Sequence, residues 1–189
     1  MGDFSQNGIV ANLHDFSIRS TEQIEKDLLK FSKERKLELI LPCLYSELEG
    51  DALPNIVNEI SKTKYLNHVI IGLDQANKSQ AKKAWKFFKK LKTPFSILWN
   101  DGPKLKKLDK ELKGIDLAPK QMGKGRNVWY CIGMAIARDE ARSVALHDCD
   151  IKTYDRRLLA KLFYPVENPL FNYEFCKGYY PRIADNKMH

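Results

Sequence analysis

The sequence predicts an α/β fold, with a Rossmann-like, mainly parallel sheet and helices on both faces. Short apolar runs rich in β-forming residues alternate with helical patterns along the chain. Hydrophobic residues make up 43% of the 189 residues, which is enough for one domain with a sizeable core. Ligands in such folds bind outside the carboxyl ends of the strands, so the polar residues after each strand are the functional candidates.

Four apolar runs are predicted to form the buried strands. They are "LELILP" (37–42), "HVIIGL" (68–73), "FSILW" (95–99) and "SVALH" (143–147). Polar residues follow them as "PCLYSE", "DQANKS", "NDGPK" and "DCD".

Three helical patterns lie between the strands. Their apolar positions are Leu53, Ile56, Val57 and Ile60; Ala81, Ala84, Trp85, Phe88 and Leu91; and Val128, Ile132, Ala135 and Ile136. The expected order is β-α-β-α-β-loop-α-β. Residues 1–36 form an amino-terminal appendage with a helix, and residues 37–189 form the α/β domain.

The charge of the chain invites a nucleic-acid interpretation. The net charge is +8, the isoelectric point is about 9.2, and lysines crowd "NKSQAKKAWKFFKKLK" (77–92). These lysines occupy the flanks and outer face of an amphipathic helix, so a solvated helix surface explains them. We therefore predict no nucleic-acid partner, and steep salt-dependent binding to DNA or RNA would support the opposite view.

Compartment and redox state follow from what the sequence lacks. No apolar stretch approaches the ~20 residues of a membrane span, and the polar amino terminus has no signal-peptide core, so a cytoplasmic protein without a membrane span is expected. The cysteines contain no C-x-x-C pair, which predicts reduced, mostly buried thiols. They are Cys43, Cys131, Cys149 and Cys176.

The segment "VALHDCDI" (144–151) carries two aspartates one residue apart at the end of a predicted strand. If the strand continues, Asp148 and Asp150 project to one side, and His147 and Cys149 to the other. Two close carboxylates favour a cation, and oxygen ligands suit Mg²⁺ or Mn²⁺. The alternative is a turn in which both aspartates cap the backbone, because D-x-D is a short and common pattern.

The segment "QMGKGRN" (121–127) precedes the third helical pattern. Gly123 and Gly125 permit close backbone approach, the helix amino terminus presents free N–H groups to an anion, and Lys124 adds positive charge. The spacing is not that of a Walker loop. Phosphate binding and a flexible hinge before a helix both fit this segment.

These pieces together resemble glycosyltransferases of the A fold, and most closely the bacterial glucosyl-3-phosphoglycerate synthase group of retaining enzymes. The resemblance rests on motifs spread from about Asp3 to the end of the chain. They are "LPCLYSE", Asp74, "GKGRN", "VALHDCDI" and "FCKGYYPR" (175–182), the last expected within an aromatic strand packed on the core.

The resemblance implies a UDP-sugar donor, a divalent metal, Mg²⁺ or Mn²⁺, and a small anionic acceptor such as phosphoglycerate. By resemblance, the loop containing Pro42, Leu44 and Glu47 holds the uridine together with Asp74. Gly123 and Lys124 approach the diphosphate. Asp148 contacts the ribose or the water of the metal, and Asp150 binds the metal itself.

Two departures from the family pattern limit this comparison. "LDQANKSQ" replaces a short acidic turn rich in serine and glycine, and the chain stops at Lys187-Met188-His189, before the segment that binds the acceptor in the family. The sequence is therefore expected to hold the nucleotide-binding half, with a homodimer as a further possibility. The alternatives are a non-catalytic nucleotide-binding fragment and a sugar-phosphate nucleotidyltransferase, although the latter class begins with a glycine-rich loop that "LPCLYSELEG" lacks.

Overall fold

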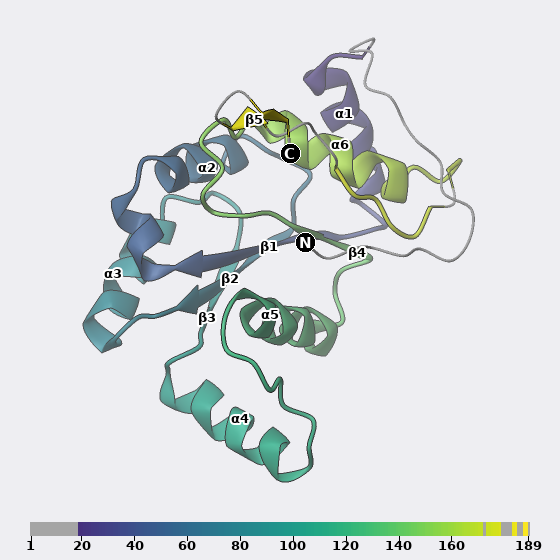
Figure 1. Cartoon of the computed structure of the whole chain (residues 1–189). Coiled ribbons are helices and arrows are strands. Elements are labelled where there is room, and N and C mark those ends of the chain that lie inside the picture. Colours follow the sequence, from purple (N-terminus) through teal and green to yellow (C-terminus); the bar gives the residue numbers. More distant parts are fainter. Residues whose placement is uncertain (1–18, 172, 179–182, 185–186, 189) are drawn as a thin grey trace.

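In a computed structural model of the chain, the described residues are 19–171, 173–178, 183–184 and 187–188. Their centre is a sheet of four strands, which pair in the order β3-β2-β1-β4 (Figure 1). All three pairings are parallel, which confirms the predicted fold class. The strands are β1 (Leu37–Leu44), β2 (His68–Asp74), β3 (Phe95–Trp99) and β4 (Ser143–Leu146).

Helices cover both faces of this sheet, as predicted (Figure 1). One face carries α1 (Thr21–Phe31), α2 (Ala52–Ile60), α3 (Lys78–Phe88) and α6 (Arg156–Glu167). The other face carries α5 (Lys124–Arg138), next to α4 (Pro103–Gly114). The short helix η1 (Tyr45–Glu49) follows β1, and β5 (Ile183–Ala184) pairs with β6 (Lys187–Met188) in a separate antiparallel ribbon.

Side-chain alternation along β1 and β2 divides the core between the two faces. Leu39 and Ile71 belong to the larger cluster under α1, α2, α3 and α6, whereas Ile40 and Ile70 pack against α5. Both strands are buried almost throughout, as expected for strands covered on two sides. Helix α1 contributes Ile24 and Leu28 to the larger cluster. The domain boundary at residue 36 stays a prediction.

Helix α5 differs from the predicted pattern in its buried face. Asn127, Cys131 and Ala135 face the sheet, while Ile132 and Ile136 are 46% and 72% exposed. The prediction that Ile132 and Ile136 lie on the buried face was therefore wrong. The buried face instead begins with a polar residue, Asn127, which the apolar pattern did not include. The displaced apolar residues line an open groove with Ile40, Val128, Val144 and Leu146.

The contact between α5 and β2 requires a glycine. Asn127 Nδ2 donates to the carbonyl oxygen of Gly72 at 2.7 Å. A Cβ atom at Gly72 would lie 1.8 Å from Asn127 Oδ1 and 2.6 Å from Cys131 Sγ. Only a residue without a side chain lets the helix approach the strand this closely.

A second connection joins α5 to α4. Asp109 on α4 accepts a hydrogen bond from Tyr130 Oη at 2.5 Å and pairs with Arg126 at 3.1 Å and Lys113 at 2.8 Å. Lys113 and Tyr130 hold the pKa of the Asp109 carboxyl well below its usual range. Burial, followed by the bond to Asp109, raises the pKa of Tyr130 to about 12. The buried charge of Asp109 is thus compensated from both helices.

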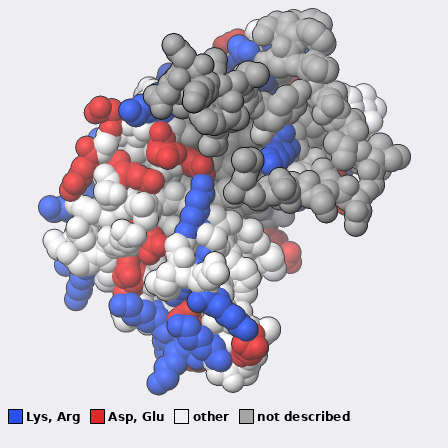
Figure 2. Space-filling model, in the orientation of Figure 1, with Lys and Arg blue, Asp and Glu red and all other residues white. Residues whose placement is uncertain are grey.

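The lysines of α3 and α4 lie at the surface, as predicted for α3. Figure 2 shows the positive charge gathered over α4, below the sheet in this view. On α3, Ala84 and Phe88 are buried, while Trp85 is 48% exposed and lies under the Lys89 ammonium at 4.3 Å. Within the described part of the chain, no helix is long and apolar enough to cross a membrane.

The aromatic segment near the carboxyl terminus is not the predicted strand where it is described. Residues 173–178 have no strand structure, and Tyr173 and Phe175 are 37% and 54% exposed. These residues pair with none of the described strands, so their side chains have no sheet to pack on. Residues 179–182 of the predicted strand lie outside the described residues.

We expect Gly72→Ala to lower the free energy of unfolding by about 3 kcal/mol, because the new methyl group overpacks the contact with α5. Gly133→Ala is the matched control. It lies inside α5 with open space where its Cβ would be, so alanine should stabilise the protein by about 1 kcal/mol. Urea unfolding of both variants measures the difference. Equal effects would contradict the close-approach argument.

Candidate functional site

The carboxyl edge of the sheet gathers the predicted site residues. Leu44 and Asp74 end β1 and β2 and lie side by side in the strand register. Ile40 pairs with Leu146 at the end of β4, so the segment after β4 emerges at the same edge. The polar segments that follow β1, β2 and β4 therefore share one end of the sheet, as the parallel order requires.

The loop after β1 is closed by its own side chain. Glu47 Oε2 accepts a hydrogen bond from the backbone N–H of Leu44 at 2.9 Å. Burial raises the pKa of the Glu47 carboxyl, and the negative charges of Asp150 and Asp148 add to this rise. Glu47 therefore lies near both carboxylates of the D-x-D segment, although the two segments are far apart in the sequence.

The D-x-D segment lies beyond the strand, and the observed strand is one residue shorter than the predicted one, residues 143–147. Strand β4 ends at Leu146, and residues 149–150 form a turn. One further ladder bond, from His147 N to Ile40 O at 3.1 Å, keeps the extended alternation going. His147 and Cys149 are buried, while Asp148 and Asp150 face outward, so the predicted division of sides is confirmed.

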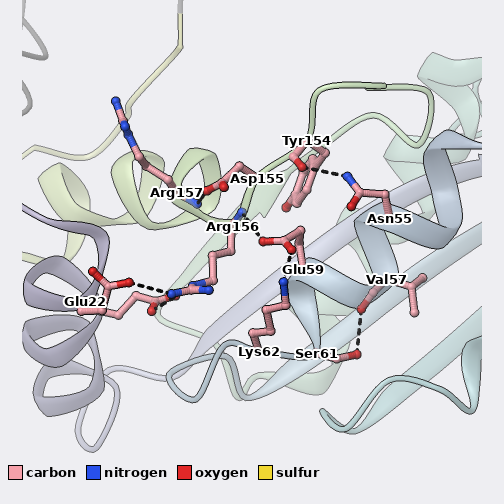
Figure 3. A network of polar contacts seen from close by, with 11 residues as sticks. Glu22, Asn55, Val57, Glu59, Ser61, Lys62, Tyr154, Asp155, Arg156 and Arg157 are labelled. Atoms are coloured by element: carbon pink, nitrogen blue, oxygen red, sulfur yellow. Dashed lines mark hydrogen bonds and ion pairs between the residues drawn. The ribbon is translucent and has the colours of Figure 1, made fainter.

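The D-x-D segment is anchored from beneath by a buried tyrosine. His147 Nδ1 lies 2.9 Å from Tyr154 Oη. Asn55 Nδ2 on α2 donates to the Tyr154 carbonyl at 2.9 Å (Figure 3). Burial lowers the pKa of His147 to about 4, so its ring is neutral at neutral pH. The loop that presents Asp148 and Asp150 is therefore fixed at both ends.

The start of α6 is held by acidic residues from two other helices. Arg156 pairs with Glu22 at 2.9 Å and Glu25 at 3.2 Å on α1, and its backbone N–H donates to Glu59 on α2 at 3.4 Å (Figure 3). Burial raises the pKa of Glu25, which Arg156 opposes. This network fixes the exit of the D-x-D loop against α1 and α2.

Lys124 meets the D-x-D segment from the amino terminus of α5. Its Nζ lies 2.5 Å from Asp148 Oδ1, and the two side chains are 59% and 41% exposed. An ion pair this exposed contributes little to stability, so either partner is available to a ligand. The sequence placed Lys124 before the helix, but α5 begins at Lys124. Gly123, with φ 116°, adopts the backbone conformation that precedes it.

The chain is similar in sequence to two curated proteins. No protein-family profile matches the chain. Glucosyl-3-phosphoglycerate synthase of Persephonella marina is 42% identical over 184 residues, which cover 97% of this chain and 46% of that protein. The synthase of Methanococcoides burtonii is 39% identical over 188 residues, covering 98% of this chain and 45% of that protein.

The chain is similar in sequence to these two glucosyl-3-phosphoglycerate synthases over nearly its whole length. It spans about half the length of the curated synthases it matches. A solved structure of the synthase from Mycobacterium tuberculosis, in complex with Mn²⁺, UDP and glucosyl-3-phosphoglycerate, aligns with a TM-score of 0.48 and 16% identity. It covers 86% of this chain and 47% of that one. The family resemblance inferred from the motifs is confirmed by the two sequence relatives.

The structure brings some of the predicted site residues together and leaves others apart. Glu47, Lys124, Asp148 and Asp150 form one group by contact or charge. Asp74 is 7% exposed and accepts a bond from Gln75 N at 3.0 Å. Pro42 is buried inside β1, so its side chain does not face the loop. It can affect the loop only through the backbone conformation of the residues after it.

Sequence reasoning missed Asn55 and Tyr154, which anchor the D-x-D loop, and the buried Asn100. Asn55 and Tyr154 are 99 residues apart, and no motif connects them. Asn100, the first residue after β3, is 2% exposed, and neither of its amide atoms has a hydrogen-bond partner. The one feature of the sequence that could have identified Asn100 is its position in the polar segment directly after a predicted strand.

We expect Tyr154→Phe to lower the free energy of unfolding by about 1–3 kcal/mol, because it leaves His147 Nδ1 buried without a partner. Tyr164→Phe is the control, since its hydroxyl bonds the exposed guanidinium of Arg19 and its loss should cost less than about 1 kcal/mol. Chemical denaturation compares the two variants. Similar losses would show that Tyr154 does not anchor the loop.

Proposed function

We propose that this chain forms the donor-binding part of a metal-dependent, retaining glycosyltransferase that takes a UDP-sugar. The hexose would pass to phosphoglycerate or a similar small anionic acceptor. One observation carries the proposal: Glu47, Lys124, Asp148 and Asp150 converge at the carboxyl edge of the sheet. They do so in a chain 42% identical to a glucosyl-3-phosphoglycerate synthase.

The outward-facing carboxylates fit a hard divalent cation. Asp148 and Asp150 offer oxygen atoms on an exposed turn, and oxygen ligands are those that Mg²⁺ and Mn²⁺ prefer. When bound there, the cation would neutralise charge that develops on the departing diphosphate. We assign Asp150 as the metal ligand and Asp148 to the ribose or a metal-bound water.

Lys124 is suited to the diphosphate. Its ammonium already pairs with a carboxylate oxygen at this edge, so an anionic phosphate can replace Asp148 as its partner. The free N–H groups at the start of α5 add to the attraction for an anion, and Gly123 leaves open space beside them. The protein contributes charge and orientation here without forming a covalent bond.

The nucleoside is assigned to the ends of β1 and β2. Leu44 is 37% exposed at the start of the η1 loop, and Asp74 lies next to it in the register. The bond from Leu44 N to Glu47 fixes the shape of this loop before a ligand arrives, which reduces the ordering cost of binding. The sugar and acceptor in the proposal follow the name of the relatives.

A second candidate is a nucleotide-binding unit without transfer activity of its own. The observation that favours it is that the matched region is 46% of the Persephonella marina synthase. A transfer assay with purified chain, UDP-glucose, 3-phosphoglycerate and Mn²⁺ separates the two. Product formation supports the transferase, and donor binding without product supports the second candidate.

We expect UDP to stabilise the chain more than other nucleoside diphosphates do, and we expect this stabilisation to require Mn²⁺. At 100-fold excess over Kd the gain is about 2.7 kcal/mol, visible as a thermal shift. Asp150→Asn should abolish the Mn²⁺-dependent part while leaving the melting temperature of the unliganded protein unchanged or slightly raised, because a like-charge repulsion is relieved.

Asp139→Asn is the matched control for Asp150→Asn. It lies at the opposite end of α5, in a left-handed conformation that asparagine also adopts, so UDP binding should be normal. A larger shift with GDP would redirect the donor assignment. Persistent Mn²⁺-dependent binding in Asp150→Asn would refute the metal assignment.

We expect Lys124→Gln to weaken UDP binding about 10- to 100-fold, as for loss of a charged hydrogen bond of about 1.5–3 kcal/mol. Stability should change little, since the Lys124–Asp148 pair is half exposed. Lys120→Gln removes a lysine from an ion pair with Asp116 that is more than 80% exposed on both sides, and should leave binding intact. Calorimetric titration decides, and equal weakening in both variants would indicate general charge attraction only.

A further inference from the structure

Three segments distant in sequence bring two thiols and a carboxylate together beneath the D-x-D loop. Cys43 lies near the end of β1, Glu47 lies in η1, and Cys149 lies in the turn after β4. One potential ligand atom from each lies within 4.8 Å of the other two. Among the residues that the structure describes, no other three acids, cysteines or histidines bring their ligand atoms this close together.

The three side chains lie on the inner side of the loop. Cys43 is 0% exposed and Cys149 is 1% exposed, whereas Glu47 is partly accessible. Asp148 and Asp150 point outward from the same turn. The D-x-D turn therefore carries two carboxylates on its outer side and the Cys149 thiol on its inner side, next to Cys43 and Glu47.

We propose that Cys43, Glu47 and Cys149 form a binding site for a thiophilic divalent cation, with Zn²⁺ as the best match. Zinc is held by thiolates and carboxylates, and thiolates select it over Mg²⁺ and Mn²⁺, which prefer oxygen. On binding, each thiol loses its proton to solvent and its sulfur donates a lone pair to the cation, without any redox change. Three protein ligands leave a fourth position for water or a substrate group.

The geometry is close to that of a bound state. With a zinc–sulfur bond of about 2.3 Å and tetrahedral angles, two sulfur ligands stand roughly 3.8 Å apart. Because the three ligand atoms lie within 4.8 Å of one another, the two sulfur atoms need to approach by about 1 Å at most. Cys43 Sγ is bonded weakly, to the carbonyl of Leu44 at 3.3 Å, so little is lost when a cation replaces this contact.

A cation in this site would join the β1–η1 loop to the D-x-D turn. These two segments are far apart in sequence, and their ends carry the residues assigned above to the nucleoside and the hard metal. The inference does not rest on the proposed glycosyl transfer, because it depends only on the ligand atoms and their burial. The expected consequence is a metal-dependent gain in stability of the whole chain.

Titration of the full reduced chain with Co²⁺, a spectroscopic substitute for Zn²⁺, tests the site without any activity measurement. One equivalent should produce thiolate-to-cobalt charge-transfer absorption and the intense visible bands of tetrahedral cobalt, and Zn²⁺ should abolish both. The thermal midpoint should rise with Zn²⁺. Absence of the charge-transfer band at stoichiometric Co²⁺ would overturn the proposal.

Variants separate this site from the other cysteines and from the outer carboxylates. Cys43→Ser and Cys149→Ser should each remove the charge-transfer band or reduce it and weaken binding. Cys176→Ser, a partly buried thiol elsewhere, and Asp150→Asn should keep both the band and the affinity. Loss of the band in Cys176→Ser, or its full retention in Cys149→Ser, would refute the assignment.

Glu47→Gln tests the third ligand in a protein that keeps both thiols and an acceptor for Leu44 N. Loss of even an outer partner of a metal ligand costs about 10- to 100-fold in affinity, so loss of a ligand should cost at least as much. The variant should fold normally, as judged by its melting curve without metal. Unchanged Zn²⁺ affinity in a folded Glu47→Gln protein would exclude Glu47 from the site.

Discussion

The arrangement of this protein depends on the close approach of helix α5 to strand β2 at Gly72. Asn127 reaches the carbonyl of Gly72, and no side chain fits between them. This contact sets the depth and angle of α5 on the sheet. Because Asn127 is the fourth residue of α5, fixing it also fixes the amino terminus of the helix, where Lys124 meets Asp148.

The candidate site illustrates how a mobile-looking segment becomes rigid. After β4 ends, the chain has no further regular structure until α6, yet its side chains alternate between core and solvent. Buried His147 and Cys149 hold the inner side, and Tyr154 and Arg156 hold the exit. Asp148 and Asp150 face solvent from a turn whose neighbouring residues are packed into the core.

Charge is distributed unequally between surface and site. The excess of lysine lies on the outer faces of α3 and α4, where it is solvated, and the functional assignment uses a single lysine. Buried charges elsewhere, such as Asp109 and Glu25, are each met by arginine or lysine. The positive net charge of this chain therefore reflects solvated lysines on its helices and does not indicate the charge of its ligand.

The sequence by itself determined the four strands, the helices α2, α3 and α5 between them, the parallel class of the sheet and the residues at its carboxyl edge, but it did not predict α4, which lies in the expected loop, or α6. These follow from local periodicity and from the rule that parallel strands end together. Alternation also separated Asp148 and Asp150 from His147 and Cys149. The exact strand ends and the first residue of α5 were displaced, because helix and strand termini depend on which backbone groups find partners.

Only the tertiary structure decided which face of α5 is buried and which distant residues meet. The apolar pattern favoured Ile132 and Ile136, but a buried Asn127 bonded to Gly72 rotates that stripe away from the sheet. The contacts of Asn55 with Tyr154, Lys124 with Asp148, and Cys43 with Cys149 and Glu47 join segments far apart in the chain. Periodicity reports the environment of a residue along its own element, and pairing across elements depends on packing that no local pattern encodes.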